Sequence, residues 1–101
     1  MFVKDMPNTT GLISRKDHLS EKDAEVVANL KKAGAILTCL TNTSQLCMWF
    51  ESSNYLYGTT NNPYNLSRIV GGSSGGEGCI VSSAGSVFGV GSDIGGSIRM
   101  V

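Results

Sequence analysis

Apolar and polar positions alternate with a helical period between residues 21 and 33. One face is apolar and the opposite face is polar; the apolar residues are Val26, Val27, Leu30 and Ala33, and the polar ones are Lys22, Glu25, Asn29 and Lys32. Such a stripe is typical of an amphipathic helix. Ser20, followed by acidic residues, predicts the N-cap of this helix, and Gly34 predicts its end.

The helix pattern gives way at once to an apolar, partly β-branched run over residues 35–40, which predicts a buried strand. A short helix is predicted over residues 43–50. Residues 51–70 are rich in Asn, Ser, Tyr and Gly and read as a long loop, a length that usually serves function. Residues 81–91 predict a helix and then a strand. Helix, tight turn and buried strand together favour an α/β architecture.

Size and charge narrow the function classes. The 101 residues suffice for one small domain, and eight basic residues balance eight acidic ones, so no charge pattern favours binding to nucleic acid or an anionic membrane. No apolar run approaches the ~20 residues of a spanning helix, and the first residues lack the apolar core of a signal peptide. We therefore expect an intracellular protein.

Three cysteines, Cys39, Cys47 and Cys79, show no Cys-x-x-Cys spacing, and only His18 could join them. An odd, scattered set argues against both a disulfide scaffold and a zinc site. Reduced thiols and no metal are expected.

Ten of the thirteen glycines fall between residues 71 and 97, where they flank two serines, Ser73 and Ser97. A flexible linker would not carry the apolar residues that this block contains. A dinucleotide fingerprint requires a third glycine where Ile94 stands, and a P-loop requires a lysine, none of which occurs after Lys32. No cofactor is implied, and a serine nucleophile is left.

Ser97 suits that role because two glycines precede it. The backbone N–H groups of Ile94, Gly95, Gly96 and Ser97 can converge on an oxyanion. A serine hydroxyl needs a base, and His18 is distant in sequence and surrounded by polar residues. A relay through a second serine to a lysine remains, one of the known variants of triad logic.

The glycine and serine pattern resembles the signature of the amidase signature family. The matching stretches are Gly71–Gly78 and Gly91–Arg99, and upstream Met6–Gly11, Ala33–Ile36, Thr41–Asn42, Leu46–Asn54 and Asn61–Tyr64 are similar to the fatty-acid amide hydrolases of that family. The resemblance implies an α/β fold with a mixed central sheet flanked by helices. It also implies that residues 1–101 form a partial domain, truncated at both ends.

The resemblance assigns roles to individual residues. Ser97 matches the nucleophile and Ser73 the bridging serine, whose peptide bond is cis in the family. Ser74, Asp93 and Arg99 match positions that support the loop. The base is a lysine: Lys4 stands in a similar Val-Lys-Asp context, whereas a gapless alignment places the catalytic lysine just before residue 1. Cys47 and Met48 are candidates for substrate contact.

Two functions follow as expectations. The first is hydrolysis of small-molecule amides or esters, lipid-derived ones among them, through an acyl-enzyme and without a cofactor. The second is a catalytically inactive product that acts as an acyl-binding or interaction module. Alone, the chain is expected to fold poorly and to turn over little substrate. Any membrane association of the parent protein would depend on a segment absent from this sequence.

Overall fold

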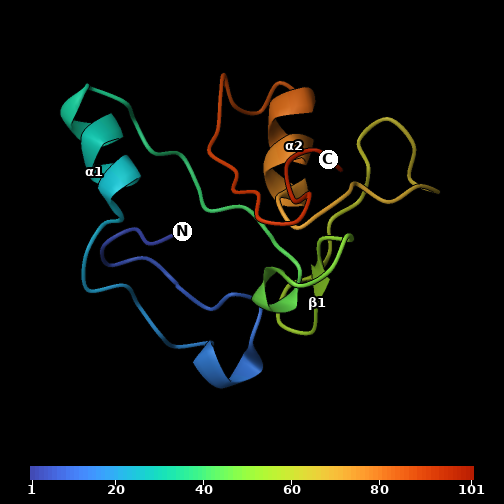
Figure 1. Cartoon of the computed structure of the whole chain (residues 1–101), viewed down its shortest axis with the longest axis horizontal. Helices are drawn as coiled ribbons and strands as arrows, with labels where there is room; N and C mark the ends of the chain where they lie inside the picture. Colours follow the sequence, from blue (N-terminus) through green and yellow to red (C-terminus); the bar gives the residue numbers. More distant parts are fainter.

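The computed structural model describes residues 1–101. It contains two α-helices, two 3-10 turns and one hairpin, in the order η1 (Ile13–Arg15), α1 (Glu25–Lys32), η2 (Gln45–Cys47), β1 (Ser53–Asn54), β2 (Gly58–Thr59) and α2 (Gly75–Ser82). Figure 1 shows α1 and α2 standing apart, joined by long irregular segments, with the C-terminus beside α2. The two strands are antiparallel, with Ser53 opposite Thr59 and Asn54 opposite Gly58.

Helix α1 ends where the sequence predicts but starts later. Its last turn is closed by Ala33, and Gly34 follows with a φ of +94°, a conformation that favours glycine. The predicted start at Ser20 is wrong. Ser20 instead forms a bridge with Lys4, and its carbonyl accepts the N–H of Asp5 at 2.8 Å. That pairing keeps the chain extended, so the helix begins only after Ala24.

The strand predicted over residues 35–40 is absent. Beyond the N–H of Ala35, which closes the end of α1, this segment forms no backbone–backbone hydrogen bond, and Ile36 is 88% exposed. The strand predicted at the end of residues 81–91 is absent too, and Val87 is 96% exposed. A strand forms only beside a pairing partner, and no segment of this chain lies beside either run.

The remaining elements shift in similar ways. Only the 3-10 turn η2 forms within the helix predicted over residues 43–50, since Leu46 and Cys47 have positive φ values of 53° and 58°. The predicted loop over residues 51–70 holds the hairpin. Its turn is shaped by Asn54, whose Oδ1 accepts the N–H groups of Leu56 and Tyr57 at 3.0 and 2.8 Å. Helix α2 begins inside the glycine block, earlier than predicted.

The apolar core is very small. Val3, Val27 and Val70 are the only hydrophobic side chains with a large apolar group that are buried, whereas seven polar residues are buried: Asn8, Thr9, Ser20, Ser44, Ser52, Asn54 and Ser73. Hydrogen bonds therefore hold the structure around the serine block. All three cysteines are free. No helix of the structure has the length and apolar character needed to span a bilayer.

Candidate active site

The bridging-serine candidate lies in a tight turn that leads into α2. Ser73 is buried, with 2% of its surface exposed, and the peptide bond between Gly72 and Ser73 is cis, the geometry that the family resemblance implies for this residue. Glycine is required here, because a Cβ on Gly72 would lie 2.9 Å from backbone atoms of Trp49 and Phe50. The hydroxyl of Ser73 forms no hydrogen bond with another residue, so it is available for chemistry.

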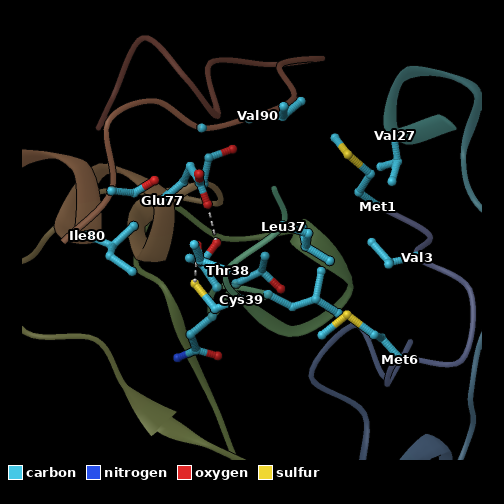
Figure 2. Close-up of a pocket in the computed structure, with 18 of the residues that line it drawn as sticks. Met1, Val3, Met6, Val27, Leu37, Thr38, Cys39, Glu77, Ile80 and Val90 are labelled. Atoms are coloured by element: carbon cyan, nitrogen blue, oxygen red, sulfur yellow. Dashed lines mark hydrogen bonds between the residues drawn. The ribbon is translucent and has the colours of Figure 1, made fainter. Parts of the chain in front are cut away.

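Ser73 lies on the wall of a cavity of about 950 Å³. Figure 2 shows Glu77 and Ile80 of α2 on one side of it, Val3 and Val27 on the other, and the segment around Leu37–Cys39 between them. Thr41 donates its hydroxyl hydrogen to Glu77 at 2.6 Å. Because the unpaired backbone of residues 36–40 forms part of the wall, the cavity is a surface that further polypeptide would satisfy, and we do not assign it to substrate.

The nucleophile candidate is held against the serine turn through the backbone. The N–H of Ser74 donates to the carbonyl of Ser97 at 3.2 Å, and Ser97 is half-buried. The hydroxyl of Ser74 both donates to the carbonyl of Ser92 and accepts its N–H, each at 3.3 Å. Two glycine-framed serines that are 24 residues apart in sequence are thereby brought to one place. No hydrogen bond joins the hydroxyls of Ser73 and Ser97.

Asp93 organises the loop that carries Ser97. Its carboxylate accepts the N–H of Gly96 at 2.7 Å and those of Ile98 and Arg99 at 3.1 and 3.2 Å, and it forms a two-point ion pair with the Arg99 guanidinium at 3.0 and 3.1 Å. The guanidinium, and then the N–H of Ile98, hold the pKa of Asp93 well below its ordinary value, while Asp93 raises the pKa of Arg99. Asp93 and Arg99 thus lie where loop-supporting residues belong.

This arrangement differs from the predicted oxyanion site at one residue. The N–H of Gly96 is bound by Asp93, so it does not point to an approaching substrate. The N–H groups of Ile94, Gly95 and Ser97 have no partner in the chain and remain available. Gly96 has a φ of +127°, which explains the need for glycine at a position whose amide serves the loop instead.

No lysine reaches the serines in this structure. Lys4 is exposed, its backbone is bridged to Ser20, and its N–H donates to Asp23 at 2.7 Å, whereas its side chain has no polar partner. Lys31 lines the cavity, but its ammonium forms an ion pair with Asp23 at 2.9 Å. The hydrogen bond from Lys4 and the ammonium of Lys31 lower the pKa of Asp23. Lys4 and the serine pair are therefore not assembled into one site.

The two residues predicted to contact substrate are separated as well. Cys47 is exposed at the edge of the cavity that Ser73 lines. Met48 is 79% exposed and faces a second hollow, where Trp49 and Tyr55 also lie. Trp49 stacks on Phe50 with 4.3 Å between ring centroids.

The site also depends on polar residues that the sequence did not single out. Asn42 donates to the carbonyls of Ser52 and Gly58 at 3.2 and 3.1 Å, and its own carbonyl accepts the N–H of Gly76 in α2. Asn54 donates to the side-chain oxygen of Asn42 at 2.7 Å. Their only signal in the sequence is that polar residues follow the apolar run 35–40 and precede a glycine block, which is too common a pattern to identify a buried network.

Comparison with known proteins places this site in a family. The sequence model described as Amidase matches residues 1–100. Since the match spans nearly the whole chain, the chain belongs to the amidase signature family.

Particular relatives agree in sequence and in structure. Human fatty-acid amide hydrolase 2 is 63% identical over 98 residues, which are 97% of this chain and 18% of the relative. The solved structure of a fatty acid amide hydrolase superposes with a TM-score of 0.93 at 42% identity, covering 99% of this chain and 18% of the other. A glutamyl-tRNA(Gln) amidotransferase subunit from Thermotoga maritima gives 0.92 at 33%, covering 97% and 22%. The chain has a part of the amidase-signature α/β fold, and it spans about a fifth of the length of these relatives.

Proposed function

We propose that residues 1–101 carry the nucleophile and the relay of an amidase-signature hydrolase that cleaves amide bonds. Ser97 is the nucleophile and Ser73 the bridging serine. A lysine outside these residues is the proton acceptor, because neither Lys4 nor Lys31 contacts the pair. The names of the relatives suggest fatty-acid amides as the substrate class. The same resemblance supports an intracellular protein whose membrane association depends on other segments.

The chemistry follows from the placement of these groups. The Ser97 oxygen bonds to the amide carbonyl carbon, its proton passes to the Ser73 oxygen, and the Ser73 proton passes to the neutral lysine. The free N–H groups of Ile94 and Gly95 would stabilise the developing oxyanion. The C–N bond then breaks as the leaving nitrogen takes up the relayed proton. Water releases the acyl group from Ser97 by the reverse relay and regenerates the serine.

One observation carries the proposal. Ser73 combines a buried position with a hydroxyl that has no partner in the chain, and its neighbour Ser74 is bonded to the backbone of Ser97. Buried hydroxyls are normally hydrogen-bonded, and an unpaired one beside a second glycine-framed serine supports a catalytic pair.

The test uses a chimera of human fatty-acid amide hydrolase 2 in which this chain replaces the 98 aligned residues, so that the host supplies the rest of the fold. We expect hydrolysis of a long-chain acyl amide and covalent labelling by a fluorophosphonate probe. Ser97→Ala should abolish both, and Ser73→Ala should slow both, whereas Ser86→Ala is a control outside the serine turn. A chimera that folds but keeps its activity after Ser97→Ala would refute the proposal.

The second candidate is an inactive acyl-binding or interaction module. The exposed Met48, Trp49 and Phe50 favour it, since they form an apolar surface at one end of the chain. A folded chimera that binds the acyl amide without hydrolysing it would favour this second function. For the isolated chain we propose little or no turnover, and labelling of its Ser97 by the probe would contradict that.

A further inference from the structure

Ser52 is the most completely buried side chain next to the serine turn. It is fully buried, with 0% exposure, and precedes β1. Its hydroxyl lies 3.0 Å from the carbonyl oxygen of Gly71 and 3.3 Å from that of Ser73, and it accepts the N–H of Gly75 at 2.9 Å. One hydroxyl thus contacts three backbone groups on both sides of the bridging serine.

These contacts replace an ordinary helix cap. The first N–H groups of a helix have no partner within it, and a serine at the N-cap normally accepts one of them. Ser74 holds that position in α2 but makes no capping bond, since its hydroxyl is exchanged with Ser92. The N–H of Gly75 is taken by Ser52 and that of Gly76 by the carbonyl of Asn42. The cap is therefore supplied by a distant part of the chain.

The glycines of the turn are fitted to this contact. A Cβ on Gly75 would lie 2.4 Å from the Ser52 hydroxyl oxygen and 2.6 Å from Val70. A Cβ on Gly72 would meet the backbone of Phe50 and Glu51. Two independent close approaches thus seat the segment before β1 against the serine turn.

We propose that Ser52 is a positioning residue for the serine pair, and this inference rests on the proposed function. By capping α2 and binding the carbonyls of Gly71 and Ser73, it fixes the turn without using the hydroxyl of Ser73 or Ser74. Ser73 is thereby left free to relay a proton, and Ser74 to hold the nucleophile loop through Ser92.

The chain offers a matched control in Ser44. It is also fully buried, and its hydroxyl also bonds to backbone, donating to the carbonyl of Trp49 at 3.0 Å and accepting its N–H at 3.2 Å. It does not touch the serine turn. Ser44→Ala and Ser52→Ala therefore remove similar buried contacts, of which only one set reaches the site.

The experiment compares both variants in the chimera. Ser52→Ala should lower the maximal rate of Ser97 labelling by about 100-fold with little change in the probe concentration at half-saturation, because a displacement of about 1 Å can cost that much. It should also speed amide hydrogen exchange in the peptide containing Gly75. Ser44→Ala should leave both close to the parent chimera. Ser52→Cys, which keeps a weak donor and acceptor, should recover part of the rate and serves if the alanine variant does not fold.

Unchanged labelling or unchanged exchange in Ser52→Ala overturns the inference, as does an equal loss in Ser44→Ala. A parent chimera that folds but does not react at Ser97 refutes the proposed function instead. In that case the exchange of the Gly75 peptide alone decides whether Ser52 holds the turn.

Discussion

The isolated chain should lack a cooperative folded state, and its exposed surface says why. It exposes 6803 Å² at a mass of 10.6 kDa. A compact monomer of that mass exposes about 5,500 Å². The excess of about 1,300 Å² is comparable to the area buried in a standard protein–protein interface.

That excess is large in energetic terms. If about 57% of it is apolar, leaving it in water forgoes roughly 18 kcal/mol at about 25 cal/mol per Å². The net stability of a whole domain is only about 5–15 kcal/mol. Ile36, Val87 and Ile94 illustrate the loss, since they are exposed by 88%, 96% and 103%. The hydrogen-bonded cluster around Ser52 cannot offset it.

Urea titration of the isolated chain measures this directly. Fluorescence of Trp49, the only tryptophan, and far-UV circular dichroism should change gradually and without coincidence, and the chain should bind a hydrophobic dye at zero urea. The chimera is the control, in which the same residues should unfold cooperatively. A single transition of the isolated chain, coincident in both signals and as steep as expected for 101 residues, would refute the reasoning.

Three further predictions concern the chimera. Gly76→Ala should destabilise by about 1–3 kcal/mol, because its Cβ would lie 2.4 Å from a neighbouring backbone oxygen. Gly78→Ala meets only a flexible side chain and should gain up to ~1 kcal/mol of helix propensity, so thermal unfolding should move in opposite directions for the two. The pKa of Asp93 is held below its ordinary 3.8, so its stabilising effect is complete above that pH and lost as pH falls below it; the difference in unfolding free energy between the parent and Asp93→Asn should be flat above pH 3.8 and shrink below, and a difference that changes between neutral pH and 3.8 would contradict this. Asn54→Ala leaves four hydrogen bonds unmade and should cost roughly 3 kcal/mol in urea unfolding, clearly more than the half-buried control Asn62→Ala.

Local signals predicted the helix end well and its start poorly. Gly34 ends α1 because a positive φ is a property of that residue alone. The start depends on a pairing between Ser20 and Lys4, which no local pattern reveals. The apolar run 35–40 has the composition of a strand, but strand formation is decided by a partner segment, and none is present in this chain.

The site divides in the same way. Ser73, Ser97 and Asp93 could be identified because glycines frame them in a recognisable pattern, and the structure places Asp93 at the centre of the nucleophile loop. Ser52 and Asn42 could not, since their importance comes from contacts across 19 or more residues of sequence. The role of Lys4 was left open by the sequence, and in the structure its side chain does not contact the serines.

The remote capping of α2 has a consequence for the order in which the protein is built. Three of its eight residues are glycines, each costing about 1 kcal/mol of helix propensity, so a peptide of residues 71–83 should be unstructured in water. The helix can form only after the segment carrying Asn42 and Ser52 has been made and folded. A reactive serine pair therefore cannot exist in a half-folded chain, and hydrolytic competence is deferred until the surrounding protein is complete.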